Sequence, residues 1–101
     1  MAMQIFIDEL RPGPTEVRLV LRGQLRAGAG DELTQRLGVL LSEGLTSITV
    51  DLAGITALDR EGFGVLVQLQ RFARAADVAF HVEHAPPLLE HLLARAEEGV
   101  V

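Results

Sequence analysis

The sequence contains no cysteine, lysine, tryptophan or tyrosine. Without cysteine, disulfides, thiolate metal sites and a cysteine nucleophile are excluded, and a reducing compartment is compatible. Without lysine, a Walker-type phosphate-binding loop is excluded. Phenylalanine is the only aromatic residue, at four positions, so the chain also lacks the stacking platform of proteins that bind single-stranded nucleic acids.

Long apolar stretches are also missing. The longest spans a handful of residues, far short of the ~20 that a membrane-crossing helix needs, and no basic segment followed by an apolar run resembles a leader. We therefore expect a cytoplasmic protein without direct membrane insertion. The net charge is −5 and the nine arginines are scattered, which disfavours nucleic acid as a partner.

The 101 residues suit one compact domain covering 1–101. Hydrophobic residues make up 49% of the chain, which is enough to build a core, and there is no repeat or linker that would divide it.

Hydrophobic periodicity predicts an α/β fold with elements in the order β-β-α-β-α-β-α. The first two strands form a hairpin around a turn at 11–14, and the helices then serve as crossovers in a small mixed sheet of four or five strands. The predicted strands are 4–8, 16–22, 47–53 and 78–83; the predicted helices are 31–43, the segment that follows Asp59, and the segment from Pro86 to Gly99.

The second helix carries the most specific local signals. Asp59 is placed to act as its N-cap, and Gly62 and Gly64 predict close approach of another backbone or helix, because glycine otherwise costs a helix about 1 kcal/mol relative to alanine. In the third helix, the spacing predicts a buried side made of leucines and one alanine: Leu88, Leu89, Leu92, Leu93 and Ala96.

Two segments carry a resemblance to a known family. Residues 17–25, VRLVLRGQL, resemble the second strand and following turn of STAS domains of bacterial anti-sigma-factor antagonists. Residues 51–66, DLAGITALDREGFGVL, resemble the family's signature strand, loop and helix, and the matching positions are Asp59, Gly62, Phe63, Val65 and Leu66. The resemblance extends over roughly the whole chain.

The chain departs from that family at functionally important positions. Family members that are switched by phosphorylation carry a serine or threonine immediately before the glycine, whereas this chain has Glu61 there and Arg60 one residue earlier. The chain is therefore a variant that cannot be phosphorylated at this position. In the loop after the second strand, where an aspartate is frequent, the chain has Arg26.

The resemblance implies a non-enzymatic module that docks on an anti-sigma factor or a related kinase-like protein and takes part in transcription regulation. Glu61 either imitates the phosphorylated state or simply removes the switch; a third interpretation is that it only complements the helix dipole. Homodimerisation stays open. The candidate partner-binding residues are Gln24, Arg26, Asp59, Arg60, Glu61, Gly62 and Phe63.

Two alternative functions remain. Stand-alone STAS domains also serve as accessory subunits of stressosome-like assemblies or of ABC-type lipid transport complexes. A sensor of small anionic ligands or nucleotides is the other alternative, because helix N-termini attract anions. Catalysis is not predicted: no hydroxyl lies in a nucleophile elbow, and although Thr56 is a conceivable phosphorylation site, it does not occupy the family's acceptor position.

Histidines and glutamates near the fourth strand raise the question of a metal site: His81, Glu83, His84, Glu90 and His91. If the strand extends to His84, alternation places His81 and His84 on opposite faces. We therefore predict no metal and no cofactor.

Overall fold

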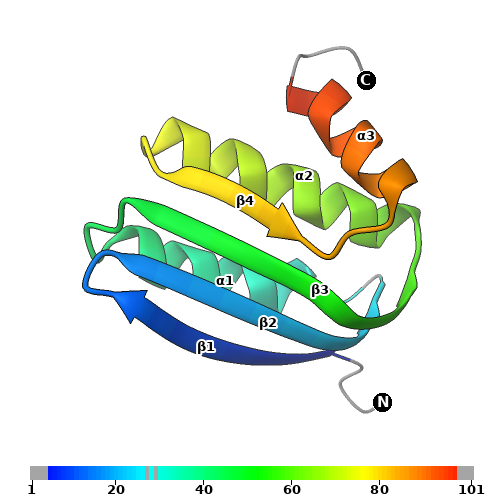
Figure 1. The fold of residues 1–101 in the computed structure, drawn as a ribbon, viewed down its shortest axis with the longest axis horizontal. Coiled ribbons are helices and arrows are strands. Elements are labelled where there is room, and N and C mark those ends of the chain that lie inside the picture. The colour runs from blue at the N-terminus through cyan, green and yellow to red at the C-terminus, as the bar shows by residue number, and fades with distance from the viewer. Residues whose placement is uncertain (1–4, 27, 29, 98–101) are drawn as a thin grey trace.

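Four strands and three helices follow one another in the order predicted from the sequence (Figure 1). The structure is a computed structural model and describes residues 5–26, 28 and 30–97. The strands are β1 (Ile5–Gly13), β2 (Glu16–Leu25), β3 (Ser47–Leu58) and β4 (Ala79–Glu83). The helices are α1 (Gly30–Leu41), α2 (Arg60–Ala75) and α3 (Pro87–Glu97).

The strands form one mixed sheet in the order β1-β2-β3-β4. β1 and β2 are antiparallel, whereas β2 with β3 and β3 with β4 are parallel. This arrangement follows from the connections, because a short turn can join only antiparallel neighbours and each parallel pair here is joined through a helix. The α/β class and the four-stranded sheet are confirmed; the described residues contain no fifth strand.

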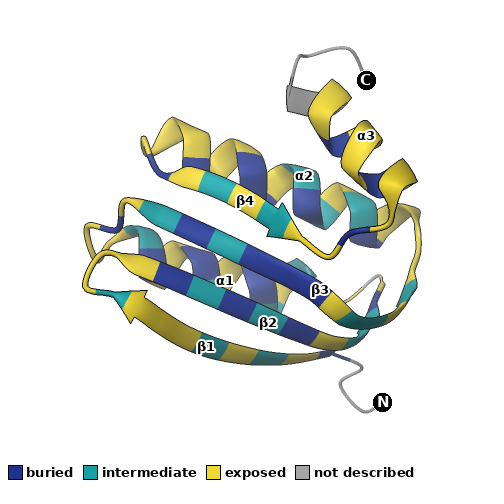
Figure 2. Ribbon diagram, viewed as in Figure 1, coloured by how far each residue is buried: buried dark blue, intermediate teal, exposed yellow. Residues whose placement is uncertain are grey.

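The core lies between one face of the sheet and the helices α1 and α2, which lie behind the strands in Figure 1. Burial alternates along the first part of β2 and at the start of β3, as expected for strands with one covered face (Figure 2). The buried apolar residues of these two strands are Val17, Leu19, Leu21, Leu25, Ile48, Val50 and Leu52. Helix α1 packs Leu33, Leu37 and Leu40 against them, a spacing that forms one apolar stripe.

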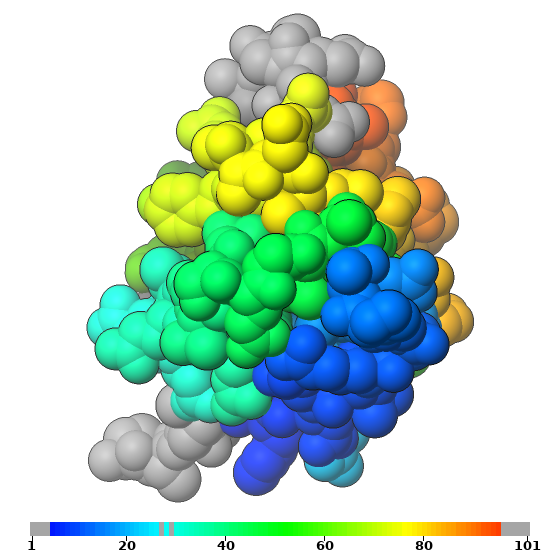
Figure 3. All heavy atoms as spheres, turned by 90° about the vertical axis from the view of Figure 1, so that its left-hand side faces the viewer, coloured from blue at the N-terminus to red at the C-terminus, as the bar shows by residue number. Residues whose placement is uncertain are grey.

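The short connections gather at one end of the sheet, which faces the viewer in Figure 3. There the β1–β2 turn meets the segment between α1 and β3 through Thr15 and Thr46, whose hydroxyl oxygens lie 2.9 Å apart. The Thr46 N–H also donates to the Thr15 carbonyl at 2.8 Å. The β3–α2 junction lies at the opposite end of the sheet (Figure 1).

Several boundaries differ from the predictions. β1 continues through Pro12 to Gly13 with an irregular register, so the turn is Pro14–Thr15; proline is tolerated because β1 is an edge strand. α1 ends at Leu41, two residues before the predicted end at 43, and Gly44 beyond it has a positive φ of 75°. The largest difference is β3, which runs to Leu58 because its second half also pairs with β2.

α3 buries less of its surface than predicted. Leu89 and Leu93 are buried, but Leu88 is 70% exposed and Leu92 is 38% exposed. The reason is that α3 packs beside α2 at the margin of the molecule and has one neighbouring helix only among the described elements (Figure 2). The side chain of Ala96 and the predicted end at Gly99 lie outside the described residues. None of the described helices is long and apolar enough to span a membrane.

Candidate functional site

The junction between β3 and α2 contains most of the residues that the sequence analysis predicts to bind a partner, Asp59 to Phe63. β3 leads directly into it, because Gln24 and Leu25 of β2 pair with Ala57 and Leu58 at the end of β3. The next residue, Asp59, is extended (φ −109°, ψ −176°), and α2 begins at Arg60.

Asp59 caps α2 as predicted. Its Oδ1 accepts a hydrogen bond from the Gly62 N–H at 2.8 Å, and its carbonyl accepts one from the Phe63 N–H at 2.9 Å. The side chain thus satisfies one of the N–H groups that a helix leaves unpaired in its first turn. Glu61 is the acidic residue of that first turn, where negative charge is favourable.

Gly62 holds the helix against β2. A Cβ at this position would collide with the Leu25 carbonyl oxygen and lie 2.8 Å from the Leu25 carbonyl carbon. The Asp59 N–H also points to this carbonyl oxygen, at 3.4 Å. The predicted close approach is therefore confirmed for Gly62, but it is wrong for Gly64, where a Cβ would meet no atom within 4 Å.

The predicted partner-binding residues come together in space but differ in exposure. Gln24 and Arg26 flank Leu25, which contacts the α2 N-terminus, so the two segments form one surface. Asp59, Arg60, Glu61 and Arg26 are exposed, and Gln24 is half-buried. Gly62 is buried and Phe63 is half-buried against the core, so they shape this surface more than they present side chains on it.

Thr56 helps to hold the ends of β2 and β3 together before the junction. Its hydroxyl donates a hydrogen bond to the Gly23 carbonyl at 3.1 Å, across the β2–β3 pair. This bond supports the continuation of β3 toward the junction, where the register between the two strands shifts.

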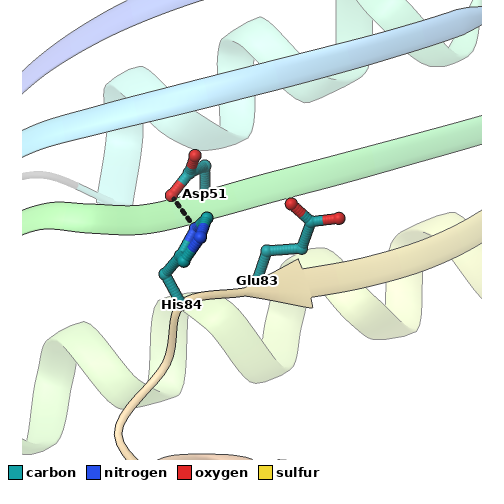
Figure 4. Close-up of side chains that lie close together, drawn as sticks. All are labelled: Asp51, Glu83 and His84. Carbon is teal, nitrogen blue, oxygen red and sulfur yellow. Dashed lines mark hydrogen bonds and ion pairs between the residues drawn. The ribbon is translucent and has the colours of Figure 1, made fainter.

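A second cluster of polar side chains lies on the helix-free face of the sheet (Figure 4). Asp51 of β3 is only 8% exposed and accepts a hydrogen bond from Arg18 Nη2 at 2.8 Å. The same nitrogen donates to Glu83 of β4 at 2.5 Å. His84 follows β4 with a left-handed φ of 61°, and its Nδ1 lies 2.8 Å from Asp51 Oδ1. The cluster therefore ties three strands and the start of the β4–α3 connection together.

The charges of this cluster stabilise one another. Burial raises the pKa of Asp51, but hydrogen bonds from the Ala53 N–H, from His84 and from Arg18 outweigh it and leave that pKa below its ordinary value. The hydrogen bond from Arg18 lowers the pKa of Glu83, and this bond together with that to Asp51 raises the pKa of Arg18. All three side chains are thus ionised at neutral pH.

The cluster contains ligand types that suit a metal ion, because side-chain ligand atoms of Asp51, Glu83 and His84 lie within 4.8 Å of one another. However, the Arg18 guanidinium already lies between the two carboxylates and supplies the positive charge. A metal ion at that point would have to displace it. The cluster is therefore complete as an ion-pair network.

Sequence reasoning identified His84 and Glu83 but missed their partners. The alternation argument failed because β4 ends at Glu83 and the backbone turns at His84, which brings its ring back to Asp51 instead of to the opposite face. The sequence did contain a useful signal. Arg18 and Asp51 each alternate with buried apolar residues, which predicts that both side chains point away from the core, and their strands are neighbours in the sheet.

Comparison with known proteins gives one family and a consistent set of folds. The family described as "Mlab, STAS domain" matches residues 10–97. No curated protein matches the chain.

Two solved anti-sigma-factor antagonists share the fold over most of both chains. The unphosphorylated form of SpoIIAA is 15% identical, with a TM-score of 0.75 over 89% of this chain and 83% of that one. An anti-sigma factor antagonist from Mycobacterium paratuberculosis is also 15% identical, with a TM-score of 0.72 over 93% of this chain and 81% of that one.

A structure of Mglu is 24% identical, with a TM-score of 0.68 over 81% of this chain. The chain spans only 20% of the length of that protein. At these identities the likenesses establish the fold alone, whereas the family match covers most of the sequence and includes the β3–α2 junction. The chain belongs to the STAS domain family.

Proposed function

We propose that this STAS domain is a non-enzymatic docking module that binds an anti-sigma factor or a related kinase-like protein. The binding surface consists of Gln24 and Arg26 at the end of β2, together with the segment from Asp59 to Phe63. One observation carries the proposal: the contact between Gly62 and the Leu25 carbonyl joins the two segments into a single, largely exposed surface.

Glu61 gives this surface a fixed negative charge. It is exposed and forms no ion pair with any residue in the described part of the chain, so its carboxylate is available to a partner. A phosphorylated serine would carry a charge of about −1.5 to −2 and could be dephosphorylated, whereas glutamate carries a single charge permanently. In the proposal, docking proceeds without a phosphorylation switch at this position.

Titration calorimetry with a purified anti-sigma factor tests the proposal. Arg60→Glu should weaken binding clearly, because it reverses a charge at the centre of the surface. Asp77→Asn is the matched control, because Asp77 is an exposed charge at the other end of α2 and asparagine also tolerates its left-handed φ of 63°. If both variants bind as the unaltered domain does, the surface is wrong.

Glu61→Ser tests whether Glu61 imitates the phosphorylated state or only complements the helix dipole, the first and the third of its interpretations. Tighter binding of the serine variant, reversed when the partner kinase phosphorylates it, would show that Glu61 imitates the phosphorylated state. Unchanged affinity would remove Glu61 from the interface and leave it with its role at the helix N-terminus.

The alternative functions predict different binding partners or ligands. An accessory subunit of a stressosome-like assembly or of an ABC-type lipid transport complex would bind an assembly subunit or a transporter ATPase in place of an anti-sigma factor. An anionic-ligand sensor would show a thermal shift with nucleotides. The exposed carboxylates at the N-termini of α1 and α2 weigh against the sensor.

A further inference from the structure

A groove of about 360 Å³ begins beside the proposed docking surface and runs between α1 and α2. Asp31 and Thr34 of α1 line one side, and Glu61, Gly64, Val65 and Gln68 of α2 line the other. The helices approach closely at its edge, where a Cβ on Gly30 would lie 3.0 Å from Val65 Cγ2. Glu61 belongs both to this groove and to the docking surface, so the two are continuous.

The charge of the groove favours a cation. Asp31 and Glu61 are both exposed, and neither forms an ion pair with another described residue. The N-termini of α1 and α2 contribute roughly half a positive charge each, and two carboxylates contribute two negative charges, which leaves a net charge of about −1. Although two helices begin here, the groove is thus suited to a positively charged group.

The shape of the groove fits a long side chain. Gly64 is exposed in the second turn of α2, and no atom of another segment lies within 4 Å of the position that its Cβ would take. Val65 offers an apolar wall, while Thr34 and Gln68 offer oxygen atoms that accept hydrogen bonds. This combination suits arginine, which has an apolar stem and a planar group with five N–H donors.

We propose that the docking surface continues into the α1–α2 groove and that the partner places an arginine side chain there, between Asp31 and Glu61. The inference rests on the proposed function, because it names the chemistry of the partner at one part of the same surface. It is tested first without any partner, so its failure can be told apart from failure of the docking surface.

The first test titrates the isolated domain with the blocked amino acid N-acetyl-arginine methylamide, followed by ¹H–¹⁵N NMR. The backbone signals of Gly64 and Val65 and the side-chain amide of Gln68 should shift together and saturate. Asp31→Asn combined with Glu61→Gln should weaken binding roughly fivefold, as expected for two exposed charge pairs. Asp77→Asn is the control and should leave the titration unchanged. Shifts spread over all surface carboxylates, equal affinity in the double variant, or stronger shifts with inorganic phosphate would each overturn the inference.

The second test closes the groove without altering charge. Gly64→Leu should fill the space and abolish the arginine response. Gly38→Leu is the matched control, because Gly38 is also an exposed glycine inside a helix with no atom within 4 Å of an added Cβ, but it does not line the groove. Both variants should fold, because leucine favours a helix more than glycine does. An arginine response that survives in Gly64→Leu contradicts the proposal.

Binding of a cognate anti-sigma factor then tests the docking surface and the groove separately. Loss of affinity in Gly64→Leu but not in Gly38→Leu supports the groove. If the partner is sensitive to Arg60→Glu but indifferent to Gly64→Leu, the docking surface stands and the groove inference fails.

Discussion

The helix-free face of the sheet and the β3–α2 junction both carry many charged side chains, but they use them differently. On the sheet, Arg18 bridges Asp51 and Glu83, and Arg22 pairs with Asp8 at 3.0 Å. At the junction, Arg26, Arg60 and Glu61 form no ion pair with any other residue that the structure describes.

The difference shows what each region contributes. Charges on the sheet face are matched across neighbouring strands, so their hydrogen bonds are made when the protein folds. Charges at the junction retain their binding capacity after folding, and only the Asp59 cap is used internally. Substitutions should therefore affect stability in the first region and partner binding in the second, except where backbone packing of the junction itself is disturbed.

The largest loss of stability is expected where a substitution disturbs the backbone packing between α2 and β2. Gly62→Ala adds a Cβ that collides with the Leu25 carbonyl oxygen, and because both atoms belong to the backbone framework, α2 must shift away from β2. We expect a loss of about 3 kcal/mol in the free energy of unfolding, measured by urea denaturation. Gly64→Ala in the same helix should instead gain up to about 1 kcal/mol, since nothing opposes its Cβ. Equal stability of the two variants would contradict the described packing.

Asp51→Ala should have the next largest effect. It removes a nearly buried carboxylate that accepts hydrogen bonds from Arg18, the Ala53 N–H and His84. We expect a loss of about 2 kcal/mol, the usual order for hydrogen bonds to a charged group. Asp8→Ala removes the carboxylate of an exposed pair on the same face and should change stability by no more than about 0.5 kcal/mol. A comparable loss in both variants would show that burial of Asp51 is not what matters.

The order of the elements follows from the sequence because it depends on local signals. Alternation in 16–22 and leucine spacing in 31–43 are local properties, and both predicted the correct element type. The second half of β3, from Gly54 to Leu58, lacks such a pattern and becomes a strand because β2 continues beside it. Pairing between segments about thirty residues apart is a tertiary effect that no local pattern reveals.

The same distinction applies to the two charged regions. Asp59 was predicted as the cap because its residue type and its place before an apolar helix are local signals. The Arg18–Asp51–His84 network needs the register of β2 with β3 and a left-handed backbone at His84, and neither follows from residue types. The groove between α1 and α2 likewise depends on how the two helices pack.

A third prediction concerns the pH dependence of stability. The pKa values of Asp51 and Glu83 are lower in the folded protein than their ordinary values of 3.8 and 4.5. Their contribution to stability is therefore complete above those ordinary values and is lost as the pH falls through them toward the lowered ones. The loss should be smaller than that caused by Asp51→Ala, because a protonated carboxyl keeps its place and some of its hydrogen bonds.

Urea denaturation of the unaltered domain and of Asp51→Asn, repeated at a series of pH values below neutral, measures this contribution. The asparagine variant should show a shallower decline in acid, because the group that titrates is gone. Parallel curves would mean that Asp51 has the same pKa in the folded and unfolded chain.

The smallest effects should separate the two carboxylates at the start of α2. Asp59→Ala removes the hydrogen bond to the Gly62 N–H and should cost about 1 kcal/mol in the free energy of unfolding. Glu61→Ala removes only a favourable interaction with the helix dipole and should cost about 0.3 kcal/mol, less at high salt. If docking depends on Glu61, the same substitution that barely changes stability will change partner affinity, and this is how a residue reserved for binding differs from one that the fold needs. A loss in Glu61→Ala as large as that in Asp59→Ala would instead assign Glu61 to the fold.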